Sequence, residues 1–186
     1  YQWMIEMRRR FNLQFSLFDL TRTASIKEHD PDLNPFLTEQ CIIASVDLMV
    51  DHEDLREQAL EAGFDLLVVD EAHHLMWSEE EGGNDRYDLV EELAEQTAGV
   101  LLLTATPEQL GVESHFARLR LLDPQRFSSL DRFLDEEEQY QQTAKIAEVL
   151  MSDDALTEEH LAALEGLLGH RIDDQPEQRM RAINEL

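Results

Sequence analysis

The sequence predicts an α/β fold in which helices flank a parallel sheet and a helical extension follows. Short, continuous apolar runs occur at 41–45, 65–70 and 100–105, and helical patterns separate them. Beyond Pro124 only helical patterns remain. Continuous runs of this kind are typical of strands buried on both faces of a parallel sheet. Their alternation with helices indicates right-handed crossovers.

The first part of the chain is expected to contain a helix, a strand and a loop. Four apolar residues at the start share one helical face, namely Trp3, Met4, Met7 and Phe11. This pattern places Trp3 in the core. A more alternating run at 13–18 predicts a strand close to a sheet edge. The stretch 20–38 contains two prolines and several charges, so we expect a loop or an insertion there.

Two further helices are expected between the apolar runs. Leu55, Ala59 and Leu60 share a face before Gly63, and glycine is the usual residue just after a helix end. The same pattern recurs in a second group of apolar residues before Gly99: Leu89, Val90, Leu93 and Ala94. The runs at 41–45 and 65–70 are therefore each followed by a predicted helix.

Residues 124–186 are expected to be helical. Apolar residues keep helical spacing from Leu130 to Met151, and a second helix is predicted from Thr157, a good N-cap, to Gly169. The polar sequence from Asp173 onward is expected to fray. We therefore divide the chain into an α/β unit, 1–123, and a helical unit, 124–186.

The charge of the chain limits what it can bind. Among 186 residues, 41 are acidic and 15 are Lys or Arg, which gives a formal net charge of −26. Such a surface repels phosphate backbones, so the chain alone is expected to bind nucleic acid poorly. Two hypotheses fit this acidity, a salt-adapted surface or a domain that faces a basic partner. The salt dependence of unfolding distinguishes them.

Other features of composition fit a reducing cytoplasm. Cys41 is the only cysteine, so no disulfide within the chain and no cysteine-rich zinc site is possible. No apolar run approaches the roughly 20 residues that a membrane span needs, so no membrane is expected as a partner. The chain starts in a helical pattern without an initiator Met or a signal-peptide layout, and we expect it to be a fragment.

Unusual polar residues follow two of the three predicted core strands. Asp70, Glu71 and His73 come after the run at 65–70, and Thr104 with Thr106 ends the run at 100–105. Ligands of α/β sheets bind at the carboxyl ends of the strands. There, one carboxylate could hold Mg²⁺ through water and the next could deprotonate an attacking water. This arrangement predicts a nucleotide-hydrolysis site, with Asp70 in the first role and Glu71 in the second.

A purely structural interpretation of these acids is also possible, because an acidic pair after a strand often caps the next helix. The neighbouring Thr-Ala-Thr-Pro at 104–107 argues against that interpretation, since capping requires nothing of the next strand. A transition-metal site at His73 and His74 is not expected. Adjacent histidines on an extended strand end should point apart, and no third ligand lies at zinc spacing.

These segments resemble the first motor lobe of superfamily-two helicases and translocases of the Swi/Snf type. Residues 70–73, Asp-Glu-Ala-His, match motif II, the Walker B element, and 103–107, Leu-Thr-Ala-Thr-Pro, match motif III. Gln2-Trp3 with Glu6 matches the end of motif Ia, and 43–45 lies where motif Ib belongs. From 65 to 127 the sequence is similar to the branch of bacterial RNA polymerase-associated ATPases.

The resemblance implies a RecA-like lobe that, with a second lobe, binds ATP and Mg²⁺ and moves along DNA. It also implies RNA polymerase as a partner, with the ATPase recycling polymerase during transcription. In that comparison Asp70 coordinates Mg²⁺ and Glu71 activates water. Three residues would couple hydrolysis to movement, namely His73, Thr104 and Thr106. Gln2 and Ser45 would lie near the nucleic-acid backbone.

The sequence also departs from the family pattern. It contains no G-x-x-x-x-G-K-[ST] phosphate-binding loop, so residues 1–123 would be an incomplete lobe and 124–186 a helical linker toward a second one. The chain alone is then expected to be inactive. Without the phosphate-loop strand, residues 100–105 would form a bare edge that invites self-association. A strand-separating helicase or a nuclease-associated motor is an alternative enzyme, and an acidic module that binds a basic partner is the alternative outside enzymes.

Overall fold

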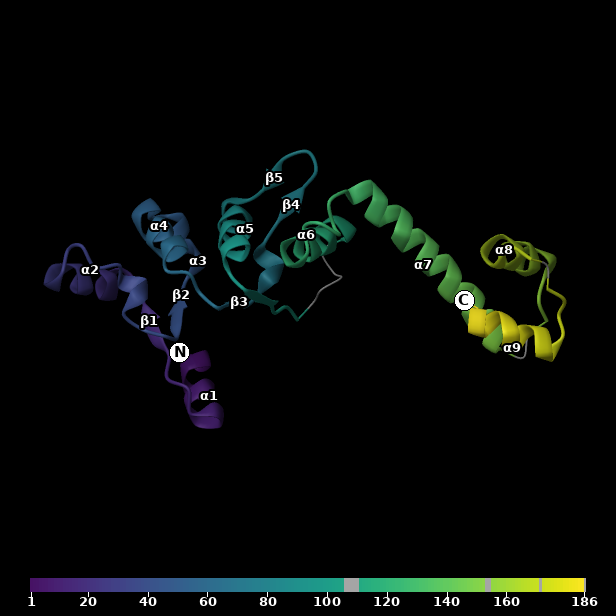
Figure 1. Ribbon diagram of the computed structural model, residues 1–186, viewed down its shortest axis with the longest axis horizontal. Helices are drawn as coiled ribbons and strands as arrows, with labels where there is room; N and C mark the ends of the chain where they lie inside the picture. Colours follow the sequence, from purple (N-terminus) through teal and green to yellow (C-terminus); the bar gives the residue numbers. More distant parts are fainter. Residues whose placement is uncertain (106–110, 153–154, 171, 186) are drawn as a thin grey trace. The chain divides into compact units, whose positions relative to one another are not determined.

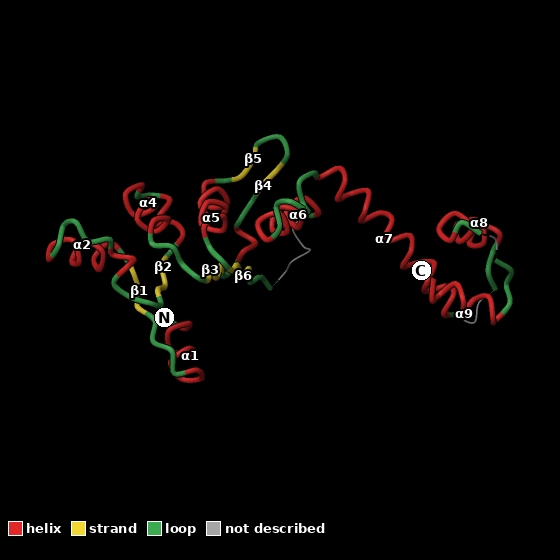
Figure 2. The backbone as a smooth tube through the Cα atoms, viewed as in Figure 1, coloured by secondary structure: helices red, strands yellow, loops and turns green. Residues whose placement is uncertain are grey.

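The computed structural model describes residues 1–105, 111–152, 155–170 and 172–185. The chain forms two compact units, Tyr1–Ser128 and Ser129–Leu186, whose elements are labelled in Figure 1. The first unit mixes helices with short strands, and the second is helical in its described residues (Figure 2). The α/β class that the sequence predicts is confirmed.

The first unit alternates strands and helices. In chain order its described elements are α1 (Gln2–Phe11), β1 (Ser16–Phe18), α2 (Leu20–His29), the 3-10 turn η1 (Pro35–Leu37), β2 (Ile42–Ala44), α3 (Val46–Val50), α4 (Glu53–Glu61), β3 (Leu66–Val69), the 3-10 turn η2 (Ala72–His74), β4 (Trp77–Ser78), β5 (Gly82–Gly83), α5 (Asp85–Gln96), β6 (Gly99–Leu102) and α6 (Val112–Leu122).

The strands form three two-stranded sheets, where the sequence predicts one. β1 pairs with β2 and β3 pairs with β6, both in parallel, whereas β4 and β5 form an antiparallel hairpin that the sequence analysis missed. The hairpin strands have two residues each, too few for an alternating pattern to be visible. In the described part of the chain, no ladder joins β2 to β3.

One face of the β3–β6 pair is exposed, which corrects the prediction that these strands are buried on both faces. Leu66 is 60% exposed, Leu101 46% and Val68 41%, whereas Val69 is buried. In these strands alternate side chains point to opposite faces. One face packs in the core, and no described element buries the other. The apolar run therefore identifies the strands correctly but overstates their burial.

Helix α5 joins two cores of the first unit, because two of its faces are apolar. Leu89 and Leu93 belong to a core shared with α3, α4, β1 and η1, and Tyr87 and Val90 belong to a second core shared with β3, η2 and α6. The Tyr87 hydroxyl donates a hydrogen bond of 3.2 Å to the Ala117 carbonyl, and burial raises the pKa of this phenol to about 12. The loop that follows β3 packs on this second core.

Helix α2 occupies part of the stretch 20–38, for which the sequence analysis expects a loop. The Asp19 side chain caps the helix by accepting a hydrogen bond of 2.8 Å from the Arg22 amide. Thr23 is buried, and its hydroxyl bonds to the Asp19 carbonyl. The two prolines that suggested a loop, Pro31 and Pro35, lie beyond the helix end. The sequence analysis did not consider the Asp19 cap, which marks the start of this helix.

The second unit contains three helices in its described residues: α7 (Leu130–Met151), α8 (Glu158–Leu168) and α9 (Pro176–Glu185). They pack around one core made of Ile146, Leu150, Leu156, Leu164, Ile172 and Ala182. The predicted caps of α8 are confirmed, since Thr157 accepts from the His160 amide and Gly169 adopts the left-handed conformation. No helix in the described residues is both long and apolar enough to cross a membrane.

Helix α9 replaces the frayed segment expected from Asp173. Pro176 begins the helix, a position where the missing proline amide costs no hydrogen bond. Ile172 and Ala182 are 5% and 2% exposed, and both belong to the core of the second unit. Tertiary packing thus orders a segment whose composition is mostly polar.

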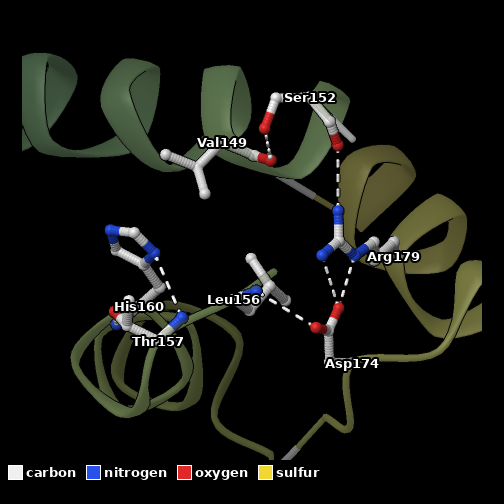
Figure 3. A network of polar contacts seen from close by, with 7 residues as sticks. All are labelled: Val149, Ser152, Leu156, Thr157, His160, Asp174 and Arg179. Carbon is white, nitrogen blue, oxygen red and sulfur yellow. Dashed lines mark hydrogen bonds and ion pairs between the residues drawn. The ribbon is translucent and has the colours of Figure 1, made fainter. Parts of the chain in front are cut away.

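A polar network fastens α9 to the end of α7 (Figure 3). Arg179 donates from Nε to Asp174 Oδ1 at 2.6 Å and from Nη1 to the Ser152 carbonyl at 2.9 Å. The other oxygen of Asp174 accepts from the Leu156 amide at 3.0 Å. The hydrogen bond from Arg179, together with that from Leu156, lowers the pKa of the Asp174 carboxyl. The ionised form of Asp174 is therefore favoured by folding.

Replacing Asp174 with Asn is expected to destabilise the second unit at neutral pH and to have less effect in acid. Because the pKa is lowered in the folded state, the stabilisation is complete well above the ordinary aspartate range of about 3.9. It is lost as the pH falls through that range toward the folded value. Urea titrations followed through the amide resonances of α9 measure the effect.

Asp173→Asn is the matched control, because it removes the same charge from the adjacent residue, whose side chain is exposed. Its unfolding midpoint should stay close to that of the parent chain. An equal loss in both variants, or a loss in Asp174→Asn that persists unchanged in acid, would contradict the role of the Arg179–Asp174 pair.

Candidate active site

The carboxyl ends of β3 and β6 lie side by side, because the two strands are parallel and in register. Val69 stands opposite Leu102. Two further hydrogen bonds continue the pairing beyond the strands: Leu103 donates to the Val69 carbonyl, and Ala72 donates to the Leu103 carbonyl, both at 2.8 Å. The loop at 70–72 is thereby held against the residues that follow β6. The predicted proximity of these two segments is present in the structure.

The backbone turns sharply at Glu71. This residue has φ 53° and ψ 44°, in the left-handed region that non-glycine residues rarely adopt. The next residue, Ala72, is fully buried in the second core, and Leu75 is 2% exposed. Burial of Ala72 and its hydrogen bond to Leu103 hold the turn in place. As a result, the side chains of Asp70 and Glu71 remain exposed at the strand ends.

Both carboxylate oxygens of Asp70 accept a hydrogen bond. Oδ1 accepts from the Glu71 amide at 3.0 Å, and Oδ2 accepts from Trp3 Nε1 at 2.6 Å. Trp3 lies in α1 and is half-buried, and α1 contains no buried residue. The expectation that Trp3 is a core residue is therefore wrong. Its indole contacts the candidate metal ligand instead.

His73 lies beside Glu71. Its Nδ1 is 3.1 Å from Glu71 Oε2, which makes an ion pair when the imidazole is protonated, and this nitrogen has no hydrogen bond to a described residue. The rings of His73 and His74 lie 4.1 Å apart, centre to centre. This corrects the expectation that the two side chains point apart. The reason is the 3-10 turn at 72–74, which places consecutive side chains closer than an extended strand would.

The remaining predicted site residues fall in different places. Thr104 is half-buried directly after Leu103, next to the acidic loop. Gln2 is exposed in the first turn of α1, beside Trp3. Ser45 is exposed between β2 and α3, and the structure shows no contact between it and Asp70. Thr106 lies outside the described residues.

Asn84 supports the loop, and Trp77 packs on α6; the sequence analysis missed both residues. Asn84 caps α5 by accepting from the Tyr87 amide, and its own amide donates to the His74 carbonyl at 3.2 Å. The ring of Trp77 packs against Phe116, with centroids 5.4 Å apart, and lies 5.3 Å from the Arg120 guanidinium. An Asn before a helical pattern is a recognisable cap, but its contact with His74 depends on the tertiary fold.

The exposed carboxylates fit a hydrated magnesium ion better than a softer metal. Magnesium takes oxygen ligands and keeps several waters, so one or two carboxylates are enough. Each oxygen of Asp70 accepts one hydrogen bond and keeps a further acceptor site. The described residues contain no group of three or more His, Cys, Asp or Glu side chains that could hold a metal ion by themselves. Water or phosphate oxygens would supply the other ligands.

The Asp-Glu-Ala-His turn at the end of a parallel strand, held against a Leu-Thr segment, defines a domain of the superfamily-two helicase class. Residues 5–109 match the family model described as type III restriction enzyme, res subunit, and the chain belongs to this family. The resemblance to superfamily-two motors found in the sequence is thus confirmed.

Individual relatives share about half of their aligned residues with the chain. It is 50% identical over 171 residues to the RNA polymerase-associated protein RapA of Cronobacter sakazakii, an alignment that covers 92% of the chain and 17% of that protein. With the RapA of Yersinia pseudotuberculosis serotype O:1b it is 49% identical over 185 residues, which cover 99% of the chain and 18% of the relative. The chain therefore spans less than a fifth of the length of these relatives.

Proposed function

We propose that the chain is part of an ATP-dependent nucleic-acid translocase that acts with RNA polymerase. The observation that carries the proposal is the hydrogen bond between the Ala72 amide and the Leu103 carbonyl, which holds the acidic turn against the segment after β6. The names of the relatives support polymerase as the partner. A polymerase partner in turn favours the bacterial cytoplasm and transcription recycling.

Asp70 and Glu71 divide the chemistry between them. Asp70 would hold hydrated Mg²⁺, which would supply the positive charge that neutralises the phosphates of ATP. Glu71 orients the attacking water and takes its proton on a carboxylate oxygen. Two features support this division: both carboxylates are exposed, and the backbone that carries them is fixed by the buried Ala72.

Three residues couple hydrolysis to movement in this proposal: His73, Thr104 and Thr106. The contact between His73 and Glu71, at 3.1 Å, supports such a role for the histidine. Thr104 follows the residue that binds the acidic turn. Gln2 and Ser45 contact the nucleic-acid backbone, and DNA is the proposed track. Their exposure supports this assignment.

We assign residues 1–123 to an incomplete RecA-like lobe with motifs Ia, Ib, II and III, and 124–186 to a helical linker toward a second lobe. The parallel pairs β1–β2 and β3–β6 support the first assignment. Since the sequence has no phosphate-binding loop, the chain alone hydrolyses no ATP. The catalytic unit is a longer protein with the dimensions of the relatives.

An acidic interaction module is the second candidate function. The formal net charge of −26 favours it, because a surface with this excess of carboxylates attracts a basic protein partner. This candidate function gives no role to the left-handed turn at Glu71 or to the hydrogen bond that holds the turn against the end of β6.

Glu71→Gln in the longer protein is expected to lower DNA-stimulated ATP hydrolysis by about 10²–10⁴-fold, the usual contribution of a general base. ATP binding should be retained, because the amide keeps the shape of the side chain. Steady-state hydrolysis and equilibrium nucleotide binding measure the two effects. The matched control is Glu80→Gln, an exposed carboxylate in the nearby hairpin loop, which should keep parental activity. Equal activity of Glu71→Gln and the parent would favour the interaction module.

We also expect the isolated chain to associate through β6 and the exposed face of the β3–β6 pair. Leu66, Val68 and Leu101 form an apolar patch on that face, and β6 has no second partner strand in the described residues. Sedimentation in high salt, which screens the net charge, should show association that increases with concentration. Leu101→Lys should reduce it, whereas Leu167→Lys, at a similarly exposed position of α8, should not. A parent chain that stays monomeric contradicts this expectation.

A further inference from the structure

We propose that Trp3 is a positioning residue for the metal site, and that its indole N–H holds the Asp70 carboxylate in the orientation that binds hydrated Mg²⁺. This inference rests on the proposed function, because it adds a residue to the same site. It assigns Trp3 a role that its apolar character does not suggest.

The contact has the features of a strong hydrogen bond. Trp3 Nε1 and Asp70 Oδ2 are 2.6 Å apart, although the residues are separated by 67 positions in sequence. An indole nitrogen can only donate, and an ionised carboxylate can only accept. Hydrogen bonds to charged acceptors are shorter than neutral ones. The side chains are therefore complementary in charge and in donor character.

With the Glu71 amide on Oδ1, the indole completes a two-point support of the carboxylate. A single donor at Oδ1 would leave the group free to rotate about its last side-chain bond. A second donor at Oδ2 removes that freedom and leaves one acceptor site on each oxygen. Partners of this kind, which do not touch the metal themselves, orient metal ligands and raise affinity.

The surroundings of α1 indicate that the contact is specific. No residue of α1 is buried, and none takes part in the two cores of the first unit. Ile5 and Phe11, which are also apolar, are 61% and 63% exposed. Trp3, Met4 and Met7 are half-buried, so apolar packing holds α1 only in part. The hydrogen bond gives Trp3 a specific partner at Asp70.

The position of Trp3 also gives the contact a consequence for coupling. Gln2, the proposed nucleic-acid contact, is the preceding residue in the same helical turn. A displacement of α1 when nucleic acid binds would change the support of Asp70 through one hydrogen bond. Trp3 would then be the only residue between the nucleic-acid contact at Gln2 and the metal site at Asp70.

Trp3→Phe in the longer protein tests the inference, because it keeps a ring and removes the N–H. The quantity to measure is the Mg²⁺ concentration that gives half of the maximal ADP binding, determined by calorimetry. We expect this concentration to rise about tenfold, the lower end of the range for losing a hydrogen-bond partner that orients a metal ligand. Trp77→Phe is the matched control, since Trp77 makes ring contacts with Phe116 and Arg120. It should leave this concentration unchanged.

The same titration with Asp70→Asn distinguishes a failure of the role of Trp3 from a failure of the proposed metal site. If Asp70→Asn raises the Mg²⁺ concentration needed for half-maximal ADP binding and Trp3→Phe leaves that concentration unchanged or lowers it, the inference about Trp3 is wrong and the proposed function stands. If neither variant changes it, the proposed metal site itself is wrong.

The contact can also be measured directly in the 186-residue chain, which has two tryptophans. Nitrogen-15 spectra should show two indole N–H resonances, assigned with Trp77→Phe. Asp70→Ala removes the acceptor, so the Trp3 resonance should move upfield while that of Trp77 stays in place. A Trp3 resonance that does not respond overturns the inference, even if Trp3→Phe unfolds the longer protein.

Discussion

The hydrogen bond from the Ala72 amide to the Leu103 carbonyl is the constraint on which the site depends. It continues the β3–β6 pairing after both strands have ended. Ala72 is also fully buried, and the chain turns just before it at Glu71, which takes the left-handed conformation. A left-handed non-glycine residue costs about 1–2 kcal/mol. The hydrogen bond to Leu103 and the burial of Ala72 offset that cost, and both carboxylates remain exposed.

The same two strands connect the site to the rest of the molecule. On one face, α5 and α6 pack against β3 and the acidic loop through the core that contains Tyr87 and Ala117. On the other face, Leu66 and Leu101 are exposed. One face of this sheet therefore packs on the core that supports the acidic loop. The other face offers an apolar surface to another segment or chain. The helical unit has its own core and its own polar network around Asp174, and neither involves the acidic loop.

The sequence predicts the elements with strong local signals and misses those that depend on tertiary contacts. Apolar runs locate all four strands of the parallel pairs, and caps such as Thr157 locate helix ends. Helix α9 was missed because a few buried side chains stabilise a mostly polar segment. In the site, the Asp-Glu-Ala-His motif and its proximity to Thr104 follow from strand order. The Trp3–Asp70 contact could not be predicted, because no local pattern specifies the partner of an indole 67 residues away.

The most direct test of the account is the structure of the longer protein bound to Mg²⁺ and a non-hydrolysable ATP analogue. The account predicts that a water ligand of the metal lies against the Asp70 carboxylate and that Glu71 faces the terminal phosphate. The hydrogen bond between Ala72 and Leu103 should be retained. A nucleotide bound away from the ends of β3 and β6, or a Glu71 side chain turned away from the phosphate, would contradict it.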